Sequence, residues 1–154
     1  MLIGSGMLNG RFDQLSERVI GCAITVHRTL GPGLLESIYR ECLALELVAA
    51  DMHVDSDCHV PVVYRGERVA GHLVLDLVVE QSLVIEVKAV ERLAPVHVAQ
   101  LITYLKITGY PVGLLMNFNA TTLRAGLKRC EHPDLFLSAD QRLIKASNKS
   151  SEAK

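Results

Sequence analysis

The sequence has no tryptophan and few other aromatic residues, with three phenylalanines and four tyrosines among 154 residues. Aliphatic side chains must therefore supply most of the core, and hydrophobic residues make up 49% of the chain. No run approaches the roughly 18–20 uncharged apolar residues of a membrane-spanning helix. Residues 1–7 have neither the basic segment nor the long apolar segment of a signal peptide. We therefore expect a protein that does not enter a membrane.

Paired cysteines and an excess of positive charge are also missing. Cys22, Cys42, Cys58 and Cys130 are scattered, without a Cys-x-x-Cys pair. This pattern disfavours a zinc or iron–sulfur site and favours reduced core thiols in a cytoplasmic protein. The formal net charge is −1, whereas a broad surface for nucleic acid usually makes the net charge positive. The mean hydropathy of +0.26 leaves aliphatic surface to be covered, which predicts an oligomer, most simply a homodimer.

The length of the chain predicts a single domain with a substantial core. We assign residues 1–12 to an N-terminal extension, residues 13–140 to the domain, and residues 141–154 to a polar, disordered tail. Apolar residues recur at three- and four-residue spacing over residues 13–30, which predicts a helix that ends at Gly31-Pro32-Gly33. Similar patterns predict helices over about residues 35–50 and 96–108.

Strands are predicted between and after these helices. Residues 58–64 are strand-like, and the nearly all-apolar residues 112–118 are typical of a strand buried on both faces. Residues 121–128 suggest a short helix and residues 134–139 an edge strand. The order helix, helix, strands, helix, strand predicts an α/β fold in which helices flank a mixed central sheet.

The stretch from Gly71 to Lys88 contains two apolar, β-branched runs that meet at the polar tip 80–82, a pattern typical of a β-hairpin. Alternation along the strands predicts one continuous apolar face, formed by Leu73, Leu75, Leu77, Val79, Leu83, Ile85, Val87 and Ala89. If the hairpin is symmetric about Gln81, Asp76 lies opposite Glu86 on the other face. Directly paired like charges are destabilising, and either Lys88 or a divalent cation such as Mg²⁺ would relieve the repulsion. A solvated network of ion pairs is the alternative interpretation.

Other acidic and histidine side chains allow two interpretations each. Glu36 lies in the first turn of the second predicted helix, where a negative charge also stabilises the helix dipole. His53, Asp55 and Asp57 alternate in the way metal ligands on a strand would, although a polar edge or loop accounts for the same pattern.

The chain resembles the Gly-x-x-Glu-x-x-Tyr proteins of the PD-(D/E)xK nuclease superfamily. The resemblance rests on an ordered set of segments from about Leu15 to Asn119, which comprises Val26-His27-Arg28, Gly33-Leu-Leu-Glu36-Ser-Ile-Tyr39, Asp76, Glu86-Val87-Lys88, Ala99-Gln-Leu101, Tyr104-Leu-Lys106 and Gly113-Leu-Leu-Met-Asn-Phe118. The superfamily core of helix, three strands, helix and strand agrees with the order of elements predicted above. One departure is Leu75-Asp76-Leu77, where relatives more often have Ala-Asp-Phe. This difference changes the packing but not the expected metal ligands.

The resemblance also implies roles for individual residues. Asp76, Glu86 and the Val87 carbonyl would bind Mg²⁺ or Mn²⁺. Lys88 would act on the attacking water and the phosphate, and Glu36 would reach the metal through water or orient Lys88. Gln100 and Tyr104 correspond to the Gln-x-x-x-Tyr element of the RecB-like branch, which lines the substrate side. His27 and Tyr39 match family positions without an assigned role.

Three functions follow from these expectations. The first is a Mg²⁺-dependent nuclease that acts on DNA or RNA through weak contacts. The second is a nuclease fold that serves only as a binding or assembly module, which the absence of a basic surface favours. The third is a metal-dependent hydrolase of another phosphate ester.

Overall fold

The computed structural model describes residues 5–137 and 139–152. The α-helices are α1 (Ser5–Leu30), α2 (Glu36–Ala49), α3 (Pro95–Thr108) and α4 (Ala139–Glu152), and a short 3-10 helix, η1, spans Arg124–Gly126. The strands are β1 (Val54–Tyr64), β2 (Glu67–Val79), β3 (Leu83–Lys88), β4 (Val112–Asn117) and β5 (Leu127–Glu131). They form one mixed sheet in the order β1-β2-β3-β4-β5, in which only β3 and β4 are parallel. The predicted α/β class is confirmed.

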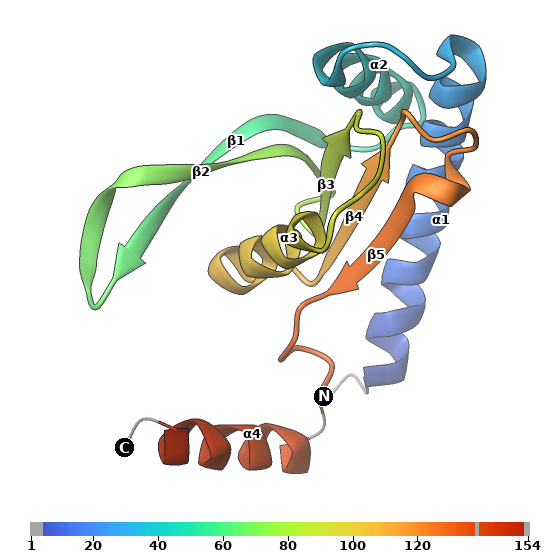
Figure 1. Cartoon of the computed structure of the whole chain (residues 1–154). Helices are drawn as coiled ribbons and strands as arrows, with labels where there is room; N and C mark the ends of the chain where they lie inside the picture. The colour runs from blue at the N-terminus through green and yellow to red at the C-terminus, as the bar shows by residue number, and fades with distance from the viewer. Residues whose placement is uncertain (1–4, 138, 153–154) are drawn as a thin grey trace.

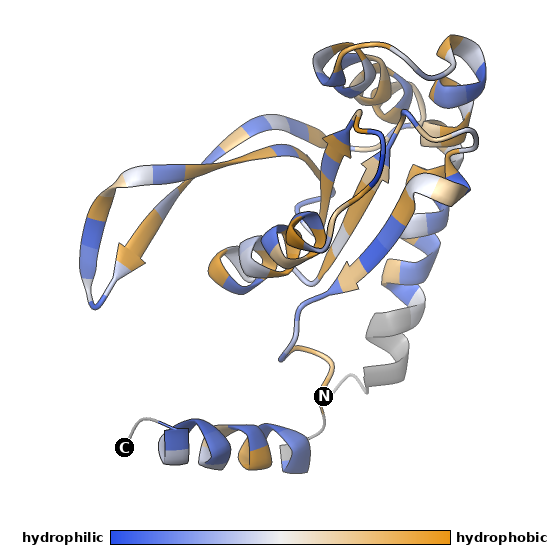
Figure 2. Cartoon of the chain, viewed as in Figure 1, coloured by the Kyte–Doolittle hydropathy of each residue, from blue (hydrophilic) through white to orange (hydrophobic). Residues whose placement is uncertain are grey.

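Helices cover both faces of the sheet (Figure 1). One face packs against α1 and α2, and this core includes Val19, Ala23, Val26, Tyr39, Leu43, Leu47, Leu77, Ile85, Val87 and Phe118. The other face packs against α3, and this second core consists of Leu75, Val78, Val84, Leu101, Leu105, Leu115 and Cys130. Strands β3 and β4 lie between the two cores, so their apolar residues are continuous rather than alternating (Figure 2).

The central hairpin has the register predicted from its symmetry. Val79 pairs with Leu83 and Leu77 with Ile85, which centres the turn on Gln81. The backbone pairing between β2 and β3 ends at Leu77, and β2 continues with β1 as a curved two-stranded arm away from the rest of the sheet (Figure 1). The two strands therefore part at Asp76 on β2 and Glu86 on β3.

The single apolar face predicted for the hairpin is wrong at Leu75. Leu77 packs in the core beneath α1 and α2, whereas Leu75 packs in the core beneath α3. The change of face coincides with an irregularity in the neighbouring strand. Asp57, which lies between the partners of Leu77 and Leu75, has a left-handed φ of 51°.

The segment after β4 differs from its prediction. The expected helix over residues 121–128 is reduced to η1, and Leu127–Glu131 instead form β5, which pairs with β4 from Met116 to Val112. The edge strand predicted at residues 134–139 is also wrong, because the described residues of that segment form turns and the start of α4. The charged side chains of β5 obscure the pattern of a strand in the sequence. Such charges are common on edge strands because they oppose aggregation.

Both ends of the described chain also differ from their predictions. Residues 5–12 of the proposed extension form the first turns of α1, and residues 1–4 lie outside the described residues. The tail predicted to be disordered contains α4, which is mostly polar (Figure 2). Its Ala, Gln, Arg, Leu and Lys residues have high helix propensity. Lys145 of α4 forms an ion pair with Asp134.

All four cysteines are free thiols; Cys130 is buried, as the prediction of core thiols expects, whereas Cys22, Cys42 and Cys58 are partly buried. Within residues 5–137 and 139–152, no helix combines the length and the apolar character that crossing a bilayer requires.

Gly126 allows η1 to pack against the end of β4, and this contact generates a first prediction. A Cβ atom at Gly126 would lie 2.4 Å from the Asn117 carbonyl oxygen and 2.9 Å from the Ala120 Cβ. Because a backbone atom cannot move aside cheaply, Gly126→Ala should lower the free energy of unfolding by about 1–3 kcal/mol.

The matched control is Gly21→Ala on the exposed side of α1, where nothing lies within 4 Å of an added Cβ. That variant should gain about 0.5–1 kcal/mol, because alanine favours a helix interior over glycine. Urea unfolding of both variants measures the difference, and equal stabilities would contradict the packing described for Gly126.

Candidate functional site

Asp76 and Glu86 are brought together where β2 leaves β3. The Asp76 N–H donates to Glu86 Oε1 at 3.2 Å, and the Val87 N–H donates to Asp76 Oδ2 at 2.8 Å. Each carboxylate thus accepts a hydrogen bond from the opposite strand at the point where backbone pairing stops. The predicted closeness of the two acids is observed, although their side chains also replace part of the backbone ladder.

Glu86 is the more buried of the two acids, with 5% of its surface exposed. Burial and the adjacent negative charge of Asp76 raise the pKa of Glu86 to about 8, against an ordinary value of 4.5. The Asp76 N–H and the positive charge of Lys88 act in the opposite direction but do not cancel these effects. The buried acid therefore holds its proton more strongly than usual, and a bound cation would favour its ionised form instead.

Lys88 ends β3, and Asn117 fixes the backbone around it. The Lys88 carbonyl accepts a hydrogen bond from the Phe118 N–H at 2.9 Å. The buried Asn117 side chain accepts from the Val90 N–H at 3.1 Å and donates to the Val90 carbonyl at 2.8 Å. Among the ion pairs formed by the described residues, none includes Lys88. The positive charge of Lys88 nevertheless lies close enough to Glu86 to lower its pKa.

Glu36 reaches the same place from the N-terminal end of α2. Its Oε1 accepts a hydrogen bond from the Ala89 N–H at 3.2 Å, directly after Lys88. Gly33 makes this approach possible, because its φ of 104° is a conformation that residues with a side chain rarely adopt. Glu36 is exposed as the helix-dipole interpretation expects, but its carboxylate also contacts the candidate site.

Gln100 and Tyr104 lie on α3, on the side of the sheet that also carries Glu86. Burial raises the pKa of the Tyr104 phenol, and the charges of Glu86 and Asp76 raise it further, while a hydrogen bond from Gln100 opposes them. The phenol is therefore close enough to both acids to be affected by their charge. Tyr104 thus lies near the point at which β2 and β3 part, and Gln100 bonds to Tyr104.

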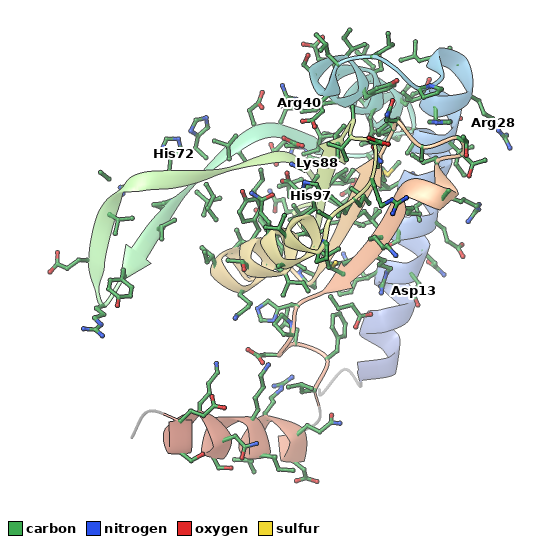
Figure 3. All side chains as sticks on the ribbon, viewed as in Figure 1. Asp13, Arg28, Arg40, His72, Lys88 and His97 are labelled. Carbon is green, nitrogen blue, oxygen red and sulfur yellow. The ribbon has the colours of Figure 1, made fainter. Side chains whose placement is uncertain are left out.

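Arg40 is the site residue that the sequence analysis missed. One guanidinium nitrogen, Nη1, lies 3.5 Å from Asp76 Oδ1 and 3.3 Å from Asp57 Oδ1. Figure 3 places Arg40 and Lys88 in the region between α2 and α3. The spacing of Glu36 and Arg40, one helical turn apart, was the available signal. Nothing in the sequence showed that Asp57 would turn toward this face.

His27 and Tyr39 belong to the scaffold that supports the site. The fully buried Tyr39 ring stacks on Phe118 with 4.7 Å between ring centroids, and its hydroxyl donates to the Gly31 carbonyl. His27 Nε2 lies 2.8 Å from the Ala120 carbonyl oxygen. These contacts connect the loop before α2 to the loop after β4, and so fix Glu36 relative to Lys88.

The oxygen atoms of this site suit a hard divalent cation. Two carboxylates and the Val87 peptide lie together, and Mg²⁺ is commonly held by one or two carboxylates, with water and substrate phosphate completing its ligands. The described residues contain no group of three or more His, Cys, Asp or Glu side chains placed to bind a metal. A cation here would thus depend on Asp76 and Glu86, with few further protein ligands.

The alternating residues after α2 do not form a separate metal site. His53 Nε2 lies 3.2 Å from Asp55 Oδ2, and both side chains are exposed. Asp57 turns instead toward Arg40. A polar edge, which was the simpler interpretation of this pattern, describes His53 and Asp55.

The comparisons with known proteins agree with this geometry. Residues 13–130 match the family model of the PD-(D/E)XK nuclease superfamily. The matched range covers most of the chain and includes every candidate residue named above. No curated protein and no solved structure gives a significant match.

The burial of Glu86 generates a prediction about pH. The native pKa near 8 lies above the ordinary value of 4.5, so the folded protein keeps a proton that the unfolded chain releases between these values. The free energy of unfolding in metal-free buffer should therefore fall as the pH rises from about 5 to about 9, by on the order of 3 kcal/mol. In Glu86→Gln this contribution should be absent, because glutamine does not ionise.

Urea unfolding in EDTA across this pH range measures the effect. Glu91→Gln, which changes an exposed glutamate in the loop after β3, is the control and should retain the pH dependence of the parent. An identical pH dependence in the parent and Glu86→Gln would contradict the raised pKa.

Proposed function

This chain belongs to the PD-(D/E)XK nuclease superfamily, and on that premise we propose that it is a Mg²⁺- or Mn²⁺-dependent nuclease acting on DNA or RNA. The observation that carries the proposal is the exchange of hydrogen bonds between Asp76 and the Glu86-Val87 segment, immediately before Lys88. The spacing of Gly33, Glu36 and Tyr39 supports placing the chain among the Gly-x-x-Glu-x-x-Tyr proteins of this superfamily.

In this proposal Asp76, Glu86 and the Val87 carbonyl hold the divalent cation. When bound, such a cation activates water and neutralises charge on the phosphate. The parting of β2 and β3 fixes both carboxylates in advance, because each accepts a hydrogen bond from the opposite strand. The raised pKa of Glu86 means that cation binding competes with a proton at neutral pH.

Lys88 is proposed to stabilise negative charge on the phosphate, a contribution commonly worth about 10²–10³ in rate. Glu36 orients this lysine through its hydrogen bond to the Ala89 N–H. Gln100 and Tyr104 line the side of the site toward α3, where a nucleotide would approach the acids. These assignments leave the substrate held mainly by contacts near the reacting phosphate, which agrees with a net charge of −1.

A binding or assembly module is the second candidate. The balanced charge of the chain favours it, because affinity for nucleic acid depends strongly on the number of phosphates that basic side chains neutralise. The ion pair between Arg40 and Asp76 also favours it, since it already supplies a positive charge to one of the two acids.

Substitution of Lys88 separates these candidates. Lys88→Ala should lower metal-dependent cleavage at least about 100-fold while leaving Mn²⁺ affinity largely unchanged, because Lys88 is not a metal ligand in this proposal. Asp76→Ala should lose both cleavage and metal binding. The measurements are cleavage of single- and double-stranded DNA and RNA at low salt, with Mg²⁺ and with Mn²⁺, and calorimetry of metal binding.

Lys106→Ala, which changes an exposed lysine in the last turn of α3, is the matched control and should cleave like the parent. Cleavage by Lys88→Ala at the parental rate would identify a contaminant and reject the nuclease. A parent that binds nucleic acid without cleaving it would support the binding module. A parent that cleaves only small phosphate esters would support the third function, a hydrolase of another phosphate ester.

We further propose that the protein works as a homodimer in the cytoplasm. The four free thiols suit a reducing compartment. Exposed aliphatic and aromatic side chains gather on the outer side of α2, at Leu45 and Val48, and at the end of the arm, at Val63 and Tyr64. Such side chains are commonly covered in an assembly.

Light scattering should therefore give twice the chain mass of 16.9 kDa at micromolar concentration. Leu45→Asp and Val63→Asp place a charge on one surface each. Only the variant whose side chain is buried in the dimer should lower the measured mass toward that of a monomer, because burying a charge is costly. A monomer mass for the parent would contradict the dimer.

A further inference from the structure

Arg40 lies where a cation would approach Asp76. Asp76 Oδ2 already accepts the hydrogen bond from the Val87 N–H, so the other oxygen, Oδ1, is the less occupied of the two. Arg40 Nη1 lies 3.5 Å from this oxygen. A divalent cation that binds Asp76 Oδ1 would therefore meet a positive charge already in place, and the two cations would repel each other.

Arg40 has a second carboxylate within reach. The same Nη1 atom lies 3.3 Å from Asp57 Oδ1, and Asp57 is more exposed than Asp76, with side-chain exposures of 54% and 19%. The left-handed backbone at Asp57 directs this acid toward α2 from the middle of β1, a position where an ordinary strand residue would follow the alternation of its neighbours. Asp57 can thus keep Arg40 beside the site without using Asp76.

There is also space for Arg40 to move. A groove of about 370 Å³ runs between α2 and β1, and it is lined by Arg40, Glu41, Ala44, Leu45, Val48, Ser56 and Asp57. Both members of the outer ion pair border this groove, whereas Asp76 does not. Rotation of the Arg40 side chain toward Asp57 and the groove would free Asp76 Oδ1.

We propose that Arg40 is a positioning residue that neutralises Asp76 in the metal-free protein and transfers to Asp57 when a divalent cation binds. The inference rests on the proposed metal site and adds a competitor to it. Without metal, Arg40 stabilises the acidic pair. Because it competes with the cation for Asp76, it lowers the affinity of the site for metal. Asp57 reduces this competition by accepting the displaced Arg40. Asp57 holds the displaced guanidinium and is not itself a ligand.

Calorimetry with Mn²⁺ tests the competition directly. Arg40→Ala and Arg40→Gln should both bind Mn²⁺ more tightly than the parent, by up to about fivefold, the range expected for a partly exposed ion pair. The difference should shrink in high salt, where the charge of Arg40 is screened. Arg28→Ala is the control for loss of one positive charge, because Arg28 lies away from the site (Figure 3) and should leave Mn²⁺ affinity unchanged.

A double-mutant cycle distinguishes transfer from a general effect of charge. Asp57→Asn keeps a residue type that tolerates a left-handed backbone, and it should weaken Mn²⁺ binding in the parent by up to about fivefold, because Arg40 then pairs with Asp76 alone. In the Arg40→Ala background the same substitution should change the affinity by no more than about twofold, the usual error of additivity. Thermal unfolding of each variant in EDTA verifies that all are folded.

The outcomes separate this inference from the proposed function. If the parent binds Mn²⁺ and both Arg40 variants bind it with the same affinity, the inference is overturned and the proposed metal site stands. An effect of Asp57→Asn that is equally large with and without Arg40 would also overturn it, since Asp57 would then act on the metal directly. No Mn²⁺ binding by the parent or by either Arg40 variant would overturn the inference and the metal site together.

Discussion

The separation of β2 from β3 at Asp76 is the constraint on which the site depends. Backbone pairing between these strands ends at Leu77 and Ile85, and two N–H groups beyond this point bond to carboxylates rather than to carbonyls. Buried N–H groups need acceptors, so the acids complete the local hydrogen bonding as well as forming a negatively charged pair. The same separation allows β1 and β2 to leave the sheet as an arm and moves Leu75 into the core under α3.

Charge balance around this point is supplied from several elements. Burial and the charge of Asp76 raise the pKa of Glu86, which favours its protonated form, and Asp76 is paired with Arg40. The charge of Lys88 also lowers the pKa of Glu86, although Lys88 forms none of the ion pairs found among the described residues. Protonation of Glu86 and the ion pair of Arg40 with Asp76 thus both reduce the negative charge of the two acids.

The scaffold explains why an ordered motif spans so much of the chain. The Glu36 carboxylate bonds to the Ala89 N–H directly after β3, and the Phe118 N–H joins that strand end to the loop after β4. The stacking of Tyr39 on Phe118 and the contact of His27 with Ala120 connect the loop before α2 to the same loop. Residues that match the family without touching the acids therefore still determine where the acids' partners lie.

The sequence by itself determined the fold class, the helices before and after the hairpin, the register about Gln81 and the meeting of Asp76 with Glu86. These features follow from local periodicity and from pairing across a short turn. Tertiary structure decided the rest. Leu127–Glu131 became a strand because β4 offered an edge, and Asp57 reached Arg40 because one left-handed residue redirected it. Such contacts depend on the relative placement of elements far apart in the chain, and no local pattern encodes that placement.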